Sequence, residues 1–364
     1  AIKVFSYTPL HKQVRPYPQR RFQPFKRLLL QKKSPLDMNR LLIFALLFSL
    51  LSCKMEDPAT PGLLVPKTVD QDPTLPQLAI NGTLLHVETF GKATDPLLVL
   101  IHGGPGGDYR SLLQAKVFAN KGYFVIFYDQ RGTGLSQRVD RSVFAGADAI
   151  QLMIDDLGKL IEHFQKVNTQ KVFLMGHSWG AMLATAFVNQ YPDKISGVVL
   201  AEPGGFTWTQ TEEYLSRSNQ IKLFSEALNN ALYPEQFFAG RNEHEILDYK
   251  ASFFGSFENA PGNTIGNAGP YPFWRNGAVA FSALIDNAEQ RGFDFTTNLQ
   301  QYPTKILFLY SELNQAYQLE WAKTVAAPYP KVQIEAIKGA GHEMLHFGWD
   351  NVYAKSLTYL NELK

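Results

Sequence analysis

A serine lies at the centre of a glycine-flanked pentapeptide, GHSWG, at residues 176–180. The pattern follows an apolar segment with strand character, Val172 to Met175, and precedes an apolar run of helical spacing that begins near Ala181. A sharp strand-to-helix turn holds such a serine at strained backbone angles and exposes its hydroxyl, while the glycines leave room for the chain to turn back. The spacing therefore indicates that Ser178 is a nucleophile. The alternative is an ordinary serine in a glycine-rich turn.

A second glycine-rich segment, HGGPGG at residues 102–107, directly follows the apolar segment Leu97 to Ile101. A loop with so little side-chain bulk lets backbone amides point at a substrate oxygen, and the amide after the nucleophile supplies a second donor. We therefore expect the backbone N–H groups of Gly104 and Trp179 to form an oxyanion hole. A phosphate-binding glycine loop is the competing interpretation, but neither GxxxxGK[ST] nor GxGxxG is present here.

A histidine follows the last predicted strand, in the sequence GAGH that ends at His342. If the fold brings this loop to Ser178, His342 can take the serine proton and later return it to the leaving group. Residues 342–346 also match HExxH, which on a continuous helix would bind zinc with Glu343 as general base and a residue such as Glu362 as third ligand. Two glycines before His342 argue against a continuous helix, so we expect no metal and no cofactor.

Three motifs occur in a fixed order: HGGPGG at residues 102–107, DQRGTGLS at residues 129–136, and GHSWG at residues 176–180. This order resembles that of the proline iminopeptidase family of α/β-hydrolases, and the resemblance is close over about residues 80–200. It implies an exopeptidase that releases an N-terminal residue, often proline, from small peptides. We interpret Asp129 and Arg131 as scaffold residues that fix their loop beside the site.

The acidic member of the triad is ambiguous. The resemblance implies an aspartate shortly after the strand Ile306 to Tyr310, but Asn314 stands there. Asparagine cannot stabilise an imidazolium by charge, and in the serine-protease template the corresponding swap lowers turnover about 10⁴-fold. We therefore predict that Glu202, which directly follows the strand Gly197 to Ala201, is the acid. The alternatives are Glu312, Asn314 as a neutral residue that orients the ring, or no functional acid.

From Gln77 onward, short apolar runs alternate with helical patterns, which indicates an α/β fold with an eight-stranded, mostly parallel sheet. We assign residues 77–202 and 303–364 to this core. Residues 203–302 are too long for a simple connection, so we predict a mainly helical cap between strands six and seven, over the C-terminal edge of the sheet. The predicted strands span residues 78–80, 84–89, 97–101, 124–128, 172–175, 197–201, 306–310 and 332–337.

The cap contains 11 Asp and Glu residues against 6 Lys and Arg residues. A free α-amino group is cationic and requires an acidic partner, so this excess favours an aminopeptidase. Glu212 and Glu213, in a helix predicted near the start of the cap, are candidates for that partner. The aromatic Trp274 is a further candidate for substrate binding. The competing interpretation of the two glutamates is that they lie on a solvated helix face.

The N-terminal region has the features of a targeting segment. A short apolar run, Leu41 to Leu51, follows Met38-Asn39-Arg40; it is too short for the roughly 20 residues that cross a bilayer but suits a signal peptide. The residues LLSC that end at Cys53 resemble the lipobox of bacterial lipoproteins, and Cys53 is the only cysteine. We predict a signal peptide at 38–52, a tether at 53–76, and a mis-assigned upstream extension at 1–37. For the apolar run, the alternatives are a buried apolar helix and a retained transmembrane anchor. For residues 1–37, the alternative is a basic arm that touches the membrane.

This interpretation places the protein in the bacterial cell envelope, attached to a membrane through a lipid on Cys53. Residues 1–37 hold nine Lys and Arg against one acidic residue, so the rest of the chain, with 26 basic and 32 acidic residues, has a net charge of −6. That acidic balance gives no electrostatic reason to expect nucleic-acid binding. We expect the partner to be a small molecule or a short peptide.

The predicted function is a serine hydrolase that forms an acyl-enzyme, of proline iminopeptidase type. A carboxylesterase of the same fold needs no acidic partner for an amine and is the first alternative. The second is a non-catalytic binding protein on a degenerate hydrolase scaffold, suggested by Asn314. Because the candidate nucleophile is serine rather than aspartate, epoxide-hydrolase and dehalogenase chemistry are disfavoured.

Overall fold

Eight strands form one sheet in the order β1-β2-β4-β3-β5-β6-β7-β8. The computed structural model describes residues 60–218, 244–258 and 264–364, which belong to one unit, Glu56–Lys364. The segments predicted as upstream extension and signal peptide, together with Cys53, lie outside the described residues. The strands are β1 Gln77–Ile80, β2 Thr83–Phe90, β3 Leu97–Ile101, β4 Phe124–Tyr128, β5 Val172–His177, β6 Gly197–Ala201, β7 Ile306–Ser311 and β8 Val332–Ile337.

In the sheet order, every pair from β4 to β8 is parallel, whereas at the other edge β1 pairs with β2 and β2 pairs with β4 in antiparallel fashion. Its central strands are apolar at successive residues because both faces are covered. In β3, Val99 packs into one core cluster and its neighbours Leu98 and Leu100 pack into the other. The predicted eight-stranded, mostly parallel sheet is thus confirmed.

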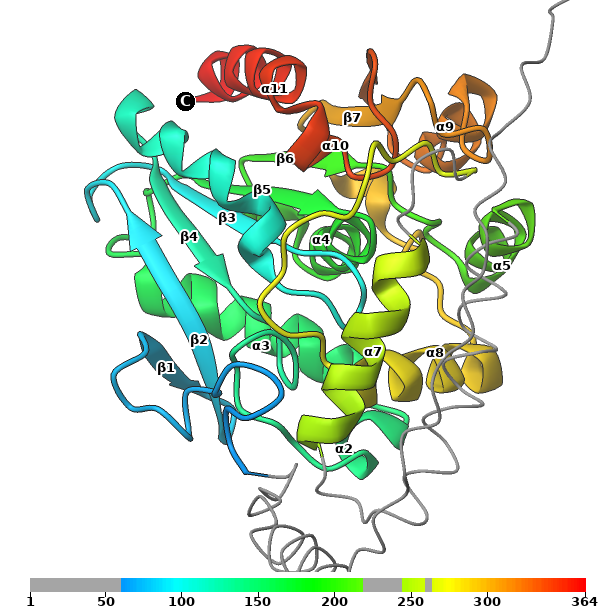
Figure 1. The fold of residues 1–364 in the computed structure, drawn as a ribbon. Coiled ribbons are helices and arrows are strands. Elements are labelled where there is room, and N and C mark those ends of the chain that lie inside the picture. The colour runs from blue at the N-terminus through cyan, green and yellow to red at the C-terminus, as the bar shows by residue number, and fades with distance from the viewer. Residues whose placement is uncertain (1–59, 219–243, 259–263) are drawn as a thin grey trace, which may run out of the picture. The chain divides into compact units, whose positions relative to one another are not determined.

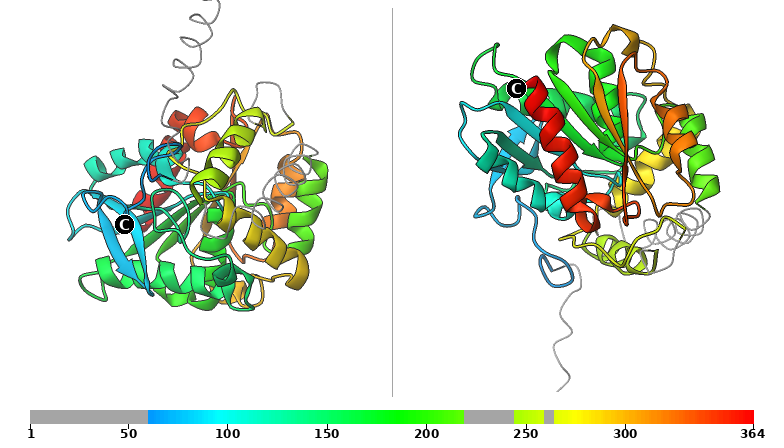
Figure 2. Two further views of the ribbon diagram at one scale, coloured as in Figure 1. Left: turned by 60° about the horizontal axis from the view of Figure 1, so that its bottom comes forward. Right: turned by 90° about the horizontal axis from the view of Figure 1, so that it is seen from above.

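Helices cover both faces of the sheet (Figures 1 and 2). One core cluster contains residues of α3 Ala149–Phe164, α4 Trp179–Gln190 and α9 Leu319–Ala326. The other contains residues of η1 Tyr109–Lys121, α10 Met344–Phe347 and α11 Trp349–Leu363. Three further short helices are α2 Ser142–Ala145, η2 Pro192–Lys194 and η3 Leu299–Gln301. Among the described helices, none is both long enough and apolar enough to span a bilayer.

The chain between β6 and β7 carries the helices α5 Trp208–Arg217, α7 His244–Glu258 and α8 Ala278–Arg291. Helix α5 begins at Trp208 because Thr207 caps it, its side chain accepting a hydrogen bond from the amide of Gln210 at 3.3 Å. Helices α7 and α8 pack against each other through small and aliphatic residues (Figure 1). These helices occupy the region predicted to form the cap.

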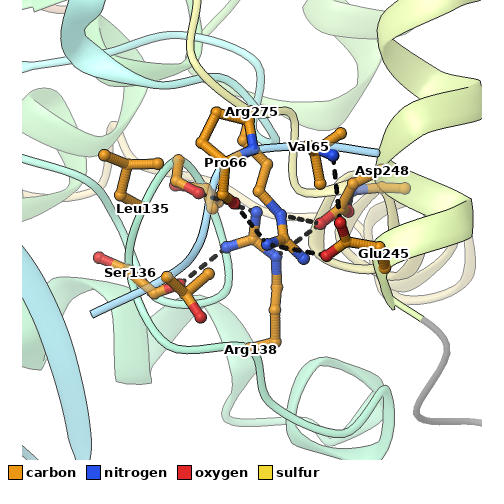
Figure 3. A network of polar contacts seen from close by, with 12 residues as sticks. Val65, Pro66, Leu135, Ser136, Arg138, Glu245, Asp248 and Arg275 are labelled. Atoms are coloured by element: carbon orange, nitrogen blue, oxygen red, sulfur yellow. Dashed lines mark hydrogen bonds and ion pairs between the residues drawn. The ribbon is translucent and has the colours of Figure 1, made fainter. Parts of the chain in front are cut away.

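A buried group of charged side chains ties α7 to the core (Figure 3). The carboxylate of Asp248 in α7 accepts hydrogen bonds from Nε of Arg138 at 2.9 Å and from Nε of Arg275 at 2.7 Å. Glu245, one helical turn earlier, accepts from the amide of Val65 at 3.1 Å. The helix is therefore held by the loop after β4, by the segment before α8, and by the chain that leads into β1.

Candidate active site

Ser178 lies at the turn between β5 and α4, where the sequence predicts a nucleophile. Its φ of 53° and ψ of −122° are a conformation that L-residues other than glycine rarely adopt. The turn is possible because Gly180 approaches β3 closely, where an added Cβ would lie 2.0 Å from the carbonyl oxygen of Ile101. The amide of Ser178 donates to the carbonyl of Ala201 at 2.9 Å, which fixes the turn beside the end of β6.

The HGGPGG loop passes directly beside this serine. A Cβ added at Gly103 would lie 3.0 Å from Cβ of Ser178, and Gly104 has a φ of 127°. On the other side, Trp179 is the first residue of α4, and amides in the first turn of a helix have no intrahelical acceptor. The loop and the helix start thus flank Ser178. The assignment of the Gly104 and Trp179 amides to an oxyanion hole stays a prediction.

Hydrogen bonds join the three sequence motifs to one another. Nε2 of His102 accepts from the amide of Gln130 at 3.0 Å, and the Gln130 side chain donates back to the carbonyl of His102 at 2.8 Å. The same side chain accepts from the indole of Trp179 at 2.9 Å. Burial lowers the pKa of His102, which favours the neutral ring that this geometry requires. Each motif therefore fixes the position of the next.

Asp129 and Arg131 make structural contacts, as their scaffold interpretation requires. Both oxygens of Asp129 are used, one by the amide of Tyr109 at 3.0 Å and the other by the amide of Leu135 at 2.7 Å. The guanidinium of Arg131 binds Asp156 through two hydrogen bonds of 2.8 and 2.7 Å. Both residues are buried.

His342 contacts the residue predicted to be its acid. Nδ1 of His342 lies 2.7 Å from Oε2 of Glu202, which is fully buried at the end of β6. Glu312 is exposed, and its carboxylate accepts from the amide of Gly339 instead. Asn314 is buried, but its amide group bonds Oε2 of Glu202 at 3.1 Å rather than the ring. Of the three candidates, Glu202 is the one whose side chain lies within hydrogen-bond distance of Nδ1 of His342.

Further donors support the buried Glu202 carboxylate. Ser311 donates to Oε1 from its amide at 2.8 Å and from its hydroxyl at 2.6 Å. The amide group of Asn314 also donates to the hydroxyl of Tyr214, so α5 of the cap region reaches this network. Buried carboxylates require such donors. Ser311 and Tyr214 were not among the residues predicted from the sequence; Ser311 could have been found from its place at the end of β7, which pairs with β6.

The loop that carries His342 rests on the residue directly before Ser178. Nε2 of His177 donates to the carbonyl oxygen of His342 at 2.7 Å, and the two rings lie 4.8 Å apart. Burial, and next the neighbouring His342, lowers the pKa of His177 to about 3, so this ring is neutral near pH 7. Burial raises the pKa of Glu343 to about 7. The contact brings the candidate base to the turn that bears the candidate nucleophile.

The interpretation of HExxH at residues 342–346 as a zinc site on one continuous helix is contradicted. Helix α10 begins at Met344, so His342 precedes the helix and does not share it with His346. His346 lies against η1, where its carbonyl accepts from the side chain of Gln114 at 2.9 Å. A pair of zinc ligands one turn apart on a single helix is thus absent at residues 342–346.

The predicted substrate-binding residues lie on α5 and on the segment before α8. Glu212 and Glu213 are exposed on α5, and Glu213 pairs with Arg217. The buried face of α5 carries Tyr214, and residues one or two positions away on a helix do not share a face. Trp274 packs edge-on against Tyr109 at 4.9 Å, within the core cluster on the η1 side. The exposure of the two glutamates agrees with the solvated-face alternative, and the substrate-binding role of Trp274 stays a prediction.

The sheet order, the serine after β5 and the histidine after β8 define an α/β-hydrolase fold. Residues 92–251 match the family model described as "Serine aminopeptidase, S33". Over 151 residues the chain is 32% identical to a proline iminopeptidase of Arabidopsis thaliana, a match that covers 42% of this chain and 35% of the relative.

Over 177 residues the chain is 32% identical to the probable aminopeptidase YbaC of Bacillus subtilis. This match covers 46% of this chain and 52% of the relative. The chain thus spans about a third to a half of the length of these curated relatives. A carboxylesterase crystal structure from Nitrososphaera gargenis superposes with a TM-score of 0.55 at 17% identity, covering 79% of this chain and 98% of the other. At that identity the likeness shows the shared fold alone.

Proposed function

We propose that the protein is a serine hydrolase in which Ser178, His342 and Glu202 form the catalytic triad. The observation that carries this proposal is the 2.7 Å contact between Nδ1 of His342 and the buried Glu202, on a loop held against the strained turn of Ser178. With Nδ1 donating to the carboxylate, the neutral ring carries its lone pair on Nε2, as a general base requires.

The proposed reaction proceeds in two halves. His342 takes the Ser178 proton as Oγ attacks the acyl carbon, and the Glu202 carboxylate stabilises the imidazolium that forms. The amides of Gly104 and Trp179 bind the developing oxyanion, a contribution of about 10² to 10³ in turnover for each donor. His342 then protonates the leaving amine or alcohol. Water hydrolyses the acyl-enzyme by the same proton transfers in reverse order.

We propose that the substrate is a short peptide with a free N-terminus, so that the protein acts as an aminopeptidase of proline iminopeptidase type. The family match and the names of the two curated relatives support this choice. The contacts of Glu202 apply equally to an ester substrate, so a carboxylesterase is the second candidate, supported by the same triad geometry.

A substrate panel tests this choice. We expect kcat/KM for an L-prolyl anilide to exceed that for the N-acetylated anilide by at least about 10²-fold, since acetylation removes the charge of the amine and adds bulk. Ser178→Ala should abolish hydrolysis of every substrate. Turnover of simple p-nitrophenyl esters without turnover of any aminoacyl anilide would instead establish the esterase.

We also propose that the mature protein is attached to a membrane of the bacterial cell envelope through a lipid on Cys53. The support is the apolar run before this single cysteine and the lipobox-like residues that end there. Metabolic labelling of the full chain with an alkyne fatty acid should mark the wild type and leave Cys53→Ser unmarked. Equal labelling of both would refute the assignment.

A further inference from the structure

Three buried side chains with metal-binding atoms gather beside the Ser178 turn. One ring nitrogen each of His177 and His342 and one carboxylate oxygen of Glu343 all lie within 4.8 Å of one another. Nδ1 of His177 is 3.9 Å from Oε2 of Glu343. Two imidazoles and a carboxylate are a ligand set typical of zinc sites that keep an open position.

The hydrogen bonds of both histidines prepare them as ligands. Nε2 of His177 is bonded to the carbonyl oxygen of His342, which can only accept, so this nitrogen carries the proton and the lone pair lies on Nδ1, toward Glu343. Nδ1 of His342 donates to Glu202, which leaves the lone pair of that ring on Nε2. Metal-binding histidines characteristically donate their second ring N–H to a carbonyl or a carboxylate in this way.

The pair formed by His177 and Glu343 favours a bound cation. In its ionised form, the Glu343 carboxylate has no hydrogen to share with the Nδ1 lone pair of the neutral His177 ring, so the two facing groups repel each other in this buried site. Bonds of roughly 2.0 to 2.2 Å to tetrahedral zinc separate its N and O ligand atoms by about 3.4 Å, so this pair needs to close by only about 0.5 Å. A cation between the two groups replaces the repulsion by two favourable bonds.

We propose that a divalent transition-metal ion of the zinc class binds His177, His342 and Glu343 and reversibly inhibits hydrolysis. The ion and the proton of Ser178 compete for the same lone pair on Nε2 of His342, so the metal-bound protein has no general base. Inhibition rests on the proposed function, whereas metal binding does not. This set differs from HExxH, because His177 comes from the serine turn and His346 takes no part.

Metal binding is measured on the full chain with the Ser178→Ala substitution, so that no hydrolysis is involved. Equilibrium dialysis against zinc chloride should give one zinc ion per chain, and magnesium should not compete, because it prefers oxygen ligands. His177→Gln and Glu343→Gln in that background should each weaken zinc binding at least about 10-fold. His163→Gln, which removes an exposed histidine, is the matched control and should bind as the parent does. Circular dichroism verifies that each variant is folded.

Inhibition is measured on the wild type and expressed as residual activity, with recovery after addition of a chelator. Zinc should inhibit the wild type, and chelation should restore its rate. Failure of the folded Ser178→Ala protein to bind zinc, or equal binding by the His177→Gln variant, would overturn the site. Binding without loss of wild-type activity would overturn the inhibitory role. A zinc-free wild type without hydrolase activity would refute the proposed function, while dialysis still decides the metal site.

Discussion

Glu202 accepts hydrogen bonds from three residues that lie more than 100 positions later in the chain, in two separate segments. His342 comes from the loop after β8, Ser311 ends β7, and Asn314 follows β7. The side chain of Asn314 occupies the place where the family resemblance implies the acid, and it now supports Glu202 instead. The carboxylate that contacts Nδ1 of His342 therefore stands at the end of β6, whereas the resemblance implies an acid shortly after β7.

Replacement of this carboxylate by an amide tests its role. Glu202→Gln keeps the shape of the side chain but removes the charge and favours the wrong ring tautomer, so we expect kcat to fall about 10⁴-fold with KM little changed. Glu312→Gln, an exposed carboxylate in the next loop, should retain nearly full activity in the same steady-state assay. A Glu202→Gln enzyme with more than about a tenth of the wild-type kcat would contradict the assignment.

The neutral His102 gives a prediction about pH. Its pKa is lowered by burial, so below the ordinary histidine pKa of about 6.5 the unfolded chain binds a proton that the native state does not. The free energy of unfolding should therefore fall as the pH decreases from about 7.5 to about 5. In His102→Gln, whose side-chain oxygen can accept from the Gln130 amide, this fall should be smaller. Urea unfolding at both pH values measures the free energy of unfolding of the two proteins. An equal fall between the two pH values in the wild type and in His102→Gln would contradict the prediction.

At the scale of elements, the segment that leads into α8 supports the HGGPGG loop at residues 102–107. The amide of Gly277 donates to the carbonyl of Gly106 at 2.7 Å, and the amide of Arg275 donates to Asp108 at 3.0 Å. The cap region and the loop beside Ser178 are thus joined through backbone groups. A displacement of α8 would be transmitted to Gly104, the predicted oxyanion donor.

Crowding this contact should slow catalysis. In Gly106→Ala, the added methyl would lie 2.6 Å from Cβ of Phe281 and 2.7 Å from the carbonyl oxygen of Gly277, so the loop must shift. Because a misplacement of about 1 Å can cost about 10²-fold, we expect kcat to fall by one to two orders of magnitude. Gly269→Ala, where an added Cβ meets nothing within 4 Å, is the control and should leave kcat unchanged. Equal kcat values for the two variants would argue against this coupling.

The strands were predictable because each is a short apolar run, and strands covered on both faces must be apolar throughout. Ser178, His342 and Glu202 each stand directly after such a run or shortly beyond it, so the parallel topology brings them to one edge. The contact of His177 with the His342 carbonyl depends on a loop path that no local pattern encodes. Glu212 and Glu213 were only candidates for substrate binding, because the acidic charge of the cap does not reveal which helix face is buried, and the structure places both on the exposed face of α5.

At the scale of the whole molecule, buried charges hold the cap helix α7 on the core (Figure 3). Asp248 forms ion pairs with two arginines, Arg138 and Arg275, and its pKa is lowered by them despite the opposing effect of burial. Arg275 also donates to the carbonyl of Pro66 at 2.8 Å, on the chain that leads into β1. The cap, the core and the N-terminal segment therefore share one electrostatic centre.

Removal of the central charge should loosen this arrangement. Asp248→Asn leaves the buried guanidinium of Arg138 without its counter-ion and that of Arg275 with only the 3.6 Å contact to Glu245, so we expect the free energy of unfolding to fall by about 3 to 5 kcal/mol. Glu213→Gln breaks an exposed ion pair and should cost at most about 1 kcal/mol. Urea unfolding of both variants under one buffer condition provides the comparison. Similar losses in the two proteins would show that the buried cluster does not anchor the cap.

The proposed mechanism depends on Ser178 being an activated nucleophile, and active-site labelling tests this most directly. A fluorophosphonate probe, followed by peptide mass spectrometry of the full chain, should give one adduct, on the peptide that contains Ser178. Labelling should be absent in Ser178→Ala and at least about 10³-fold slower in His342→Ala. A folded wild-type protein that stays unlabelled, or that carries its adduct elsewhere, would contradict the account and favour a binding protein on a hydrolase scaffold.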